Sequence, residues 1–180
     1  MKLNENHNQN YIFIGMPAAG KSTVGVVFAK KLGLNFIDSD ILIQEKTGKK
    51  LHEIISESGR EAFSEIEDNV NAGICGDHMV IATGGSVVFH EKAMNHLREI
   101  GTVIYLETTP EDLAVRIGDL DERGVVHKPG ETIADIYEER RPYYEKYADI
   151  TVREPSGAFD ISRILDAVLE TLKEENSLDA

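Results

Sequence analysis

Residues 11–25 read YIFIGMPAAGKSTVG, an apolar run that leads into a glycine-rich turn. The turn holds the pattern G-x-x-x-x-G-K-S, which begins at Gly15 and ends at Ser22. This order predicts a strand from Tyr11 to Ile14, then a sharply bent loop, then a helix that starts as the loop ends. Such a loop turns successive backbone N–H groups toward a phosphate, and the helix adds the positive end of its dipole. The stretch therefore predicts a nucleotide-phosphate site.

Two side chains of the pattern add chemistry to this loop. Lys21 supplies a mobile positive charge for the terminal phosphates, and the hydroxyl of Ser22 can ligate Mg²⁺. A glycine turn that carries a surface lysine is the alternative. We expect the loop and the helix start to bind the nucleotide, through Gly15, Ala18, Ala19, Gly20, Lys21, Ser22 and Thr23.

Short apolar runs alternate with longer helical patterns through the rest of the chain. Most of the runs lack polar alternation, which is typical of parallel strands buried on both faces. Further strands are predicted over residues 35–37, 79–82, 102–106 and 149–152. Helices are predicted over residues 22–33, 108–120 and 161–175. This alternation predicts an α/β fold with a doubly wound parallel sheet and helices on both faces.

The composition limits the possible partners and the compartment. The chain has 180 residues, which suits one domain, and a net charge of −13, which disfavours nucleic acids and anionic membranes. A single cysteine, Cys75, cannot form an internal disulfide, and no apolar run is long enough to span a membrane. We expect a cytoplasmic monomer with one domain over residues 11–174 and tails at 1–10 and 175–180.

A polar stretch with three glycines, GDLDERGVVHKPGET, runs from Gly118 to Thr132. Its length and composition suit a mobile lid over a binding site. A plain surface loop fits the composition equally well.

Residues 35–40 read NFIDSD, a short apolar run that ends in two aspartates. One interpretation is that Asp40 is the N-cap of a following helix. The other follows from the fold, because ligands of parallel sheets gather at the carboxyl ends of the strands, where the phosphate loop also lies. We then expect Asp38 to lie in the magnesium region and Asp40 to accept the proton of a hydroxyl that attacks the γ-phosphate. This predicts a kinase of a small alcohol.

Several motifs together resemble those of the shikimate kinase family. They occur in the order GMPAAGKS, FIDSD, VIATGG, DERGVV and ERRPYYEKYAD, and the resemblance extends from about Tyr11 to Leu172. It implies a three-layer P-loop kinase fold with a five-stranded parallel sheet and a closing lid. It also implies ATP, Mg²⁺ and transfer of the γ-phosphate to a ring hydroxyl of shikimate, a step of aromatic amino-acid biosynthesis.

The resemblance assigns roles to residues around the acceptor. It implies that Asp40 contacts the substrate hydroxyl and that Asp38 lies on the magnesium side. It implies that the N–H groups of Gly84 and Gly85 face the substrate.

The resemblance also assigns three arginines. It implies that Arg123 in the lid reaches the phosphates and acts in catalysis with Lys21 and Asp40, that Arg116 flanks the adenine, and that Arg140 grips the substrate carboxylate. For Arg116 and Arg140 the alternative is a surface ion pair, because both lie in helical patterns rich in acids.

The chain departs from the family pattern mainly on the acceptor side. In GREAFS, residues 59–64, Ser64 stands where the family has a second carboxylate-binding arginine, and Arg60 stands where it has a glutamate. Ser86 replaces the third glycine of the turn. The cation has either moved by one helical turn, to Arg60, or has been lost. We therefore include Arg60, Ser64 and Ser86 among the candidate substrate-binding residues.

These departures leave the acceptor open between two small hydroxy acids. Shikimate is favoured by the overall resemblance. A hydroxy amino acid such as homoserine is the alternative, because its carboxylate needs only Arg140 and no second arginine. A nucleotide-binding module without acceptor chemistry is the alternative of a different class.

Overall fold

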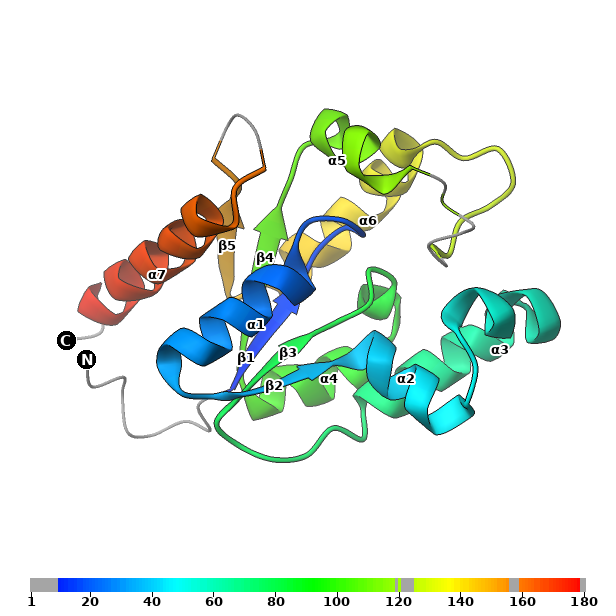
Figure 1. Ribbon diagram of the computed structural model, residues 1–180, viewed down its shortest axis with the longest axis horizontal. Coiled ribbons are helices and arrows are strands. Elements are labelled where there is room, and N and C mark those ends of the chain that lie inside the picture. The colour runs from blue at the N-terminus through cyan, green and yellow to red at the C-terminus, as the bar shows by residue number, and fades with distance from the viewer. Residues whose placement is uncertain (1–9, 119, 121–124, 156–158, 179–180) are drawn as a thin grey trace.

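The computed structural model describes residues 10–118, 120, 125–155 and 159–178, and its centre is a parallel sheet between layers of helices (Figure 1). The strands, in the order in which they lie in the sheet, are β2 (Asn35–Asp38), β3 (Met79–Ala82), β1 (Tyr11–Ile14), β4 (Thr102–Glu107) and β5 (Ile150–Arg153). The helices are α1 (Lys21–Leu32), α2 (Ser39–Thr47), α3 (Leu51–Asn71), α4 (Glu91–Ile100), α5 (Pro110–Ile117), α6 (Ile133–Tyr147) and α7 (Ile161–Leu178), with a 3₁₀ turn, η1, at Val87–Phe89.

The predicted parallel sheet is confirmed, and its centre is apolar for a structural reason. Every residue of β1 and β3 is buried, because helices cover both faces of the sheet at these two strands. All four strand pairs are parallel, with Tyr11 opposite Val80 on one side and Thr102 on the other. The edge strand β5 alternates between buried and exposed residues and begins at Ile150, one residue later than predicted.

Helices cover the two faces of the sheet in separate pairs. Helix α1 packs against β2 and β3 and also against α7, which lies along β5 (Figure 1). Helices α4 and α6 contact β4 from the opposite face, and α3 packs against α4. Apolar stripes hold these layers together, for example Val24 and Phe28 of α1, both fully buried.

The carboxyl ends of β1, β2 and β3 lie at one edge of the sheet. The phosphate loop, the first turn of α2 and the turn from Thr83 to Ser86 therefore begin side by side. Helix α3 approaches the same edge after a break at Gly59, whose φ of 85° and ψ of 169° are not helical.

The predicted lid falls only partly within the described chain. Residues 119 and 121–124, including Arg123, lie outside it. Val125 and Val126 are described and lie just before α6. Within the described residues, no helix is both long and apolar enough to cross a membrane.

Candidate active site

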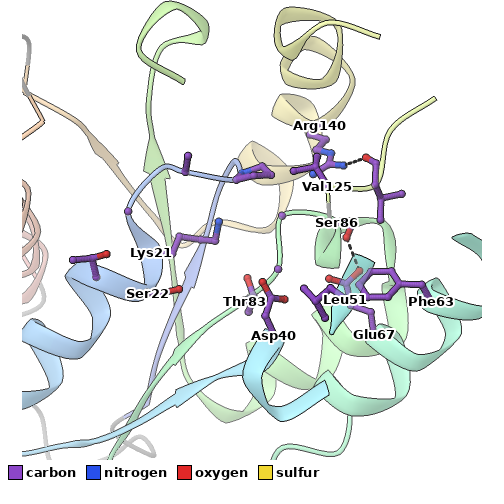
Figure 2. Close-up of a pocket in the computed structure, with 17 residues that line it drawn as sticks. Lys21, Ser22, Asp40, Leu51, Phe63, Glu67, Thr83, Ser86, Val125 and Arg140 are labelled. Carbon is purple, nitrogen blue, oxygen red and sulfur yellow. Dashed lines mark hydrogen bonds between the residues drawn. The ribbon is translucent and has the colours of Figure 1, made fainter. Parts of the chain in front are cut away.

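A cavity of about 280 Å³ opens at the carboxyl edge of the sheet (Figure 2). The phosphate loop forms one wall, and α2, α3, the turn after β3, α6 and the chain before α6 form the others. The described residues that line it are Pro17, Ala18, Gly20, Lys21, Ser22, Thr23, Asp40, Leu51, Phe63, Glu67, Thr83, Gly84, Gly85, Ser86, Val125, Val126 and Arg140.

The phosphate loop has the backbone that the sequence pattern predicts. Gly15 has a φ of 142°, and a Cβ there would lie 2.7 Å from the carbonyl oxygen of Leu106, so only glycine fits. Gly20, with a φ of 90°, precedes α1, and the first turn of α1 carries no acidic residue. The positive end of the α1 dipole is therefore free to attract an anion.

Lys21 is buried and points back into the loop. Its Nζ donates hydrogen bonds to the carbonyl oxygens of Gly15 and Met16, each 2.8 Å away. Burial lowers the pKa of Lys21 to about 8, although the nearby carboxyl of Asp40 counteracts part of this shift. The ammonium group thus closes the loop from the inside and also lines the cavity.

The two aspartates after β2 have different environments. The Oδ1 atom of Asp38 accepts hydrogen bonds from the backbone N–H groups of Asp40 and Ile41, at 3.0 and 3.4 Å. Asp38, not Asp40, is therefore the N-cap of α2, and the capping interpretation for Asp40 is wrong because its side chain lines the cavity instead.

Asp40 is placed to exchange a proton. The pKa of Asp40 is raised to about 7, mainly by burial and also by the nearby carboxyls of Glu67 and Asp38, while Lys21 counteracts part of the shift. A carboxyl with a pKa near the working pH is well matched to proton transfer.

The turn after β3 is packed closely against its neighbours. A Cβ at Gly85 would lie 2.7 Å from Cδ of Pro17 and 2.9 Å from Nη1 of Arg140. The hydroxyl of Tyr144 donates to the carbonyl oxygen of Gly85 at 2.6 Å, and the backbone N–H of Gly84 donates to Ser39 Oγ at 3.2 Å. This packing explains why small residues are needed here.

Glu67 is a cavity residue that sequence reasoning missed. It is 1% exposed, and its Oε2 atom accepts a hydrogen bond of 2.6 Å from Ser86 Oγ (Figure 2). The same Oε2 atom lies 3.0 Å from His90 Nε2. Its Oε1 atom is buried and has no hydrogen-bond partner among the described residues. One sequence signal was available, because Glu67 lies four residues after Phe63 and three before Val70, on the apolar stripe of α3.

Arg140 enters the cavity from α6. It is 2% exposed, so the surface ion-pair alternative is wrong for this residue. Its Nη2 donates to the carbonyl oxygen of Val126, and its guanidinium lies 5.7 Å from the ring centroid of Phe89. Its Nε atom has no partner within the described part of the chain. Arg140 therefore places a buried positive charge in the cavity wall, where it can bind an anionic group of a ligand.

Arg116 does form an ion pair, but not an exposed one. Its two Nη atoms donate to the two carboxylate oxygens of Glu154 at 2.8 and 2.7 Å, and the two side chains are 15% and 8% exposed. Its guanidinium also lies 4.6 Å from the ring centroid of Phe159, and this ring lies beside Gly20 at the start of α1. Arg116 is therefore near the phosphate loop but does not line the cavity.

The remaining predicted residues are not brought into the cavity. Arg60 and Ser64 lie on α3 after the break at Gly59, but the described lining residues of this helix are Leu51, Phe63 and Glu67. Three more predicted residues are missing from the described lining: Gly15 and Ala19, which belong to the phosphate loop, and Asp38, which caps α2. The predicted residues Ala18, Thr23 and Ser86 do line the cavity.

Comparison with known proteins identifies the family. The family model for shikimate kinase matches residues 17–173. The chain belongs to the shikimate kinase family. A shikimate kinase of Vibrio parahaemolyticus is 36% identical over 148 residues, which are 81% of this chain and 86% of that protein. A shikimate kinase of Clostridium botulinum is 41% identical over 140 residues, which are 77% and 84% of the two chains.

Solved structures agree with the sequence comparison. A shikimate kinase from Acinetobacter baumannii, in complex with shikimate, superposes with a TM-score of 0.81 at 29% identity and covers 96% of this chain and 95% of that one. A gluconokinase from Sinorhizobium meliloti shares the fold alone, with a TM-score of 0.60 at 16% identity over 95% and 96% of the chains. Like the shikimate kinase family, this chain is a small-molecule kinase, a phosphotransferase with an alcohol acceptor.

Proposed function

We propose that this kinase transfers the γ-phosphoryl group of ATP to a hydroxyl of shikimate and forms shikimate 3-phosphate. The observation that supports this most strongly is that one cavity joins the phosphate-loop residue Lys21 to Asp40 and Arg140. The relative from Acinetobacter baumannii was solved with shikimate, and family membership favours the same acceptor here.

Each of these three residues has a distinct role in the proposed reaction. Lys21 places a positive charge beside the terminal phosphates and moves from the loop carbonyl oxygens to them. Asp40 accepts the proton of the attacking hydroxyl, and its raised pKa suits this role. Arg140 binds the substrate carboxylate through its guanidinium, whose Nε atom has no partner among the described residues.

The residues near the loop fit a magnesium ion that arrives with the nucleotide. Mg²⁺ keeps several waters and takes one or two protein ligands beside the phosphates. Ser22 lines the cavity, Asp38 ends β2 at the same edge of the sheet, and the described residues hold no group of three or more carboxylate, histidine or cysteine ligands. Ser22 and Asp38 would hold the ion, which supplies positive charge that neutralises the phosphates.

Other residues of the site bind or enclose the nucleotide in this proposal. Arg116, braced by Glu154 and stacked on Phe159, flanks the adenine. The segment of residues 118–132 closes as a lid and brings Arg123, which lies outside the described residues, to the phosphates. Ser86 and the N–H group of Gly85 face the acceptor, whereas the N–H group of Gly84 does not, because it donates to Ser39 Oγ.

A hydroxy amino acid such as homoserine is the second candidate acceptor. The observation that favours it is the absence of a second arginine, since Arg140 is the one arginine among the described lining residues. Arg60, the cation that could replace this arginine, is not among the described lining residues, and neither is Ser64. An acceptor with one carboxylate and an additional polar group suits such a wall.

The variant Asp40→Asn tests whether the site is catalytic. The purified wild-type protein should release ADP from Mg²⁺-ATP when shikimate is added, and the variant should lose about 100-fold or more of this rate, because the proton acceptor is gone. Nucleotide affinity, measured by calorimetry, should change little. A nucleotide-binding module without acceptor chemistry would instead show no shikimate-dependent rate in either protein.

A further inference from the structure

Tyr144 is a fully buried tyrosine of α6 whose hydroxyl reaches the turn after β3. The hydroxyl donates to the carbonyl oxygen of Gly85 at 2.6 Å and lies 3.8 Å from Sδ of Met16 in the phosphate loop. The ring stacks on that of Tyr105 in β4, with the ring centroids 5.0 Å apart and the ring planes 19° apart. Burial raises the pKa of Tyr144 to about 12, so the hydroxyl is protonated at neutral pH and acts as a donor. Tyr144 therefore has a fixed position between the phosphate loop and the turn.

The turn after β3 has its carbonyl oxygens paired and two of its N–H groups free. The carbonyl oxygens of Gly84 and Ser86 accept hydrogen bonds from N–H groups of η1, at 3.4 and 3.0 Å. The carbonyl oxygen of Gly85 accepts from Tyr144. The N–H groups of Gly85 and Ser86, in contrast, make no hydrogen bond among the described residues. They are two consecutive donors on residues that line the cavity.

Tyr144 determines which way the peptide unit between Gly85 and Ser86 faces. This peptide is trans, and in a planar trans peptide the C=O and N–H groups point in opposite directions. The carbonyl oxygen of Gly85 is turned toward Tyr144, which does not belong to the described lining of the cavity. The N–H of Ser86 is therefore turned the other way. Because glycine has no side chain to restrict its backbone, a contact from outside the turn is needed to hold this orientation, and the hydroxyl of Tyr144 supplies it.

Arg140 lies against the same turn. It precedes Tyr144 by one turn of α6, and its Nη1 atom would lie 2.9 Å from a Cβ built on Gly85. Figure 2 shows Arg140 and Ser86 on the same side of the cavity. The free N–H groups of the turn and the guanidinium are therefore close enough to bind the same molecule, and a rotation of the turn would change the position of its donors relative to Arg140.

We propose that Tyr144 is a positioning residue for the acceptor, and that its hydroxyl holds Gly85 so that the N–H groups of Gly85 and Ser86 donate to the acceptor beside Arg140. This inference rests on the proposed function and adds to it a residue that acts through the turn, without touching the acceptor. The same donors serve the acceptor before and during phosphoryl transfer. Loss of the Tyr144 hydroxyl should therefore raise KM for the acceptor and leave kcat nearly unchanged.

The variant Tyr144→Phe keeps the ring that stacks on Tyr105 and removes only the donor. We expect KM for shikimate to rise about 5- to 10-fold, with kcat and KM for ATP within about twofold of the wild type. KM does not depend on how much of the protein is folded, so partial unfolding of the variant cannot produce this result. Tyr147→Phe is the matched control, since Tyr147 is a buried tyrosine of the same helix whose hydroxyl makes no hydrogen bond among the described residues.

The control should leave both KM values within about twofold of the wild type. If KM for shikimate in Tyr144→Phe also stayed in this range, or if KM for ATP rose equally, Tyr144 would have a structural role only and the inference would be overturned. A wild-type protein that does not phosphorylate shikimate would refute the proposed function instead.

Amide hydrogen exchange tests the two donors in the wild-type protein itself. NMR follows the N–H groups of Gly85 and Ser86 with Mg²⁺-ADP bound, with and without shikimate. Shikimate should slow the exchange of both groups, because each gains an acceptor, and the effect should be smaller in Tyr144→Phe. Exchange that shikimate leaves unchanged at both positions, in a protein that phosphorylates shikimate, would overturn the inference and leave the proposed function intact.

Discussion

Two ionisable side chains of opposite charge are shifted toward neutrality in the same cavity. Burial lowers the pKa of Lys21 to about 8 and raises the pKa of Asp40 to about 7, because both lose contact with water. In the proposed reaction, bound ligands return the interactions that these groups lost: the phosphates contact Lys21, and the hydroxyl of the acceptor donates to Asp40.

The raised pKa of Asp40 predicts the acid side of the pH profile. Only the ionised carboxylate accepts a proton, so kcat/KM for the acceptor should rise about tenfold per pH unit below pH 7 and then level off. The measurement is the initial rate between pH 5 and pH 8 with saturating nucleotide. If the limb instead lay near pH 4, the ordinary range of a carboxyl, Asp40 would not be the group that titrates.

Elements whose position follows from the local sequence pattern could be predicted, whereas features that depend on packing between distant segments could not. The strand β1, the phosphate loop and the start of α1 follow from residues 11–25, because glycine conformation and apolar pattern act locally. The cap at Asp38 depends on where β2 ends, one residue beyond the prediction. Burial of Glu67 depends on the turn after β3 and on α4, which are distant in sequence, so only the apolar stripe of α3 indicated it.

The break in α3 offers a test at the scale of a single element. Gly59 has φ 85° and ψ 169°, a conformation essentially restricted to glycine, and the space around it is open apart from Glu61 Oε2 at 3.7 Å. Gly59→Ala should therefore lower the free energy of unfolding by about 1–3 kcal/mol through backbone strain alone. Urea denaturation of the variant and the wild type measures this change in the free energy of unfolding.

The control for this prediction is Ser58→Ala at the neighbouring exposed position. It should change the free energy of unfolding by no more than about 0.5 kcal/mol. Equal stability of Gly59→Ala and the wild type would mean that α3 is straight in solution.

The whole molecule places its chemistry at one edge of the sheet. Three parallel strands end there, and each delivers one part of the site: the phosphate loop, the aspartates and the glycine turn. The alternation of strands and helices in the sequence predicted a parallel sheet with such an edge. The five-stranded sheet that the family resemblance implied is confirmed. That the chain acts as a monomer in the cytoplasm stays a prediction.

Nucleotide binding should stabilise the whole molecule. A ligand present at 100 times its Kd stabilises the folded state by about 2.7 kcal/mol, which for a chain of this size raises Tm by roughly 5–10 °C. Differential scanning fluorimetry with and without Mg²⁺-ATP measures this shift. Lys21→Ala should abolish most of it, because the positive charge beside the phosphates is lost. An unchanged Tm for the wild type would argue against a nucleotide site in the phosphate loop.

The most direct test of the central claim is the mass of the acceptor after reaction. The wild-type protein is incubated with shikimate and Mg²⁺-ATP, and the mixture is analysed by mass spectrometry. We predict that shikimate gains the mass of one phosphoryl group and that ADP appears in equal amount. Release of ADP and inorganic phosphate with unmodified shikimate would show hydrolysis rather than transfer, and would contradict the claim that this protein phosphorylates shikimate.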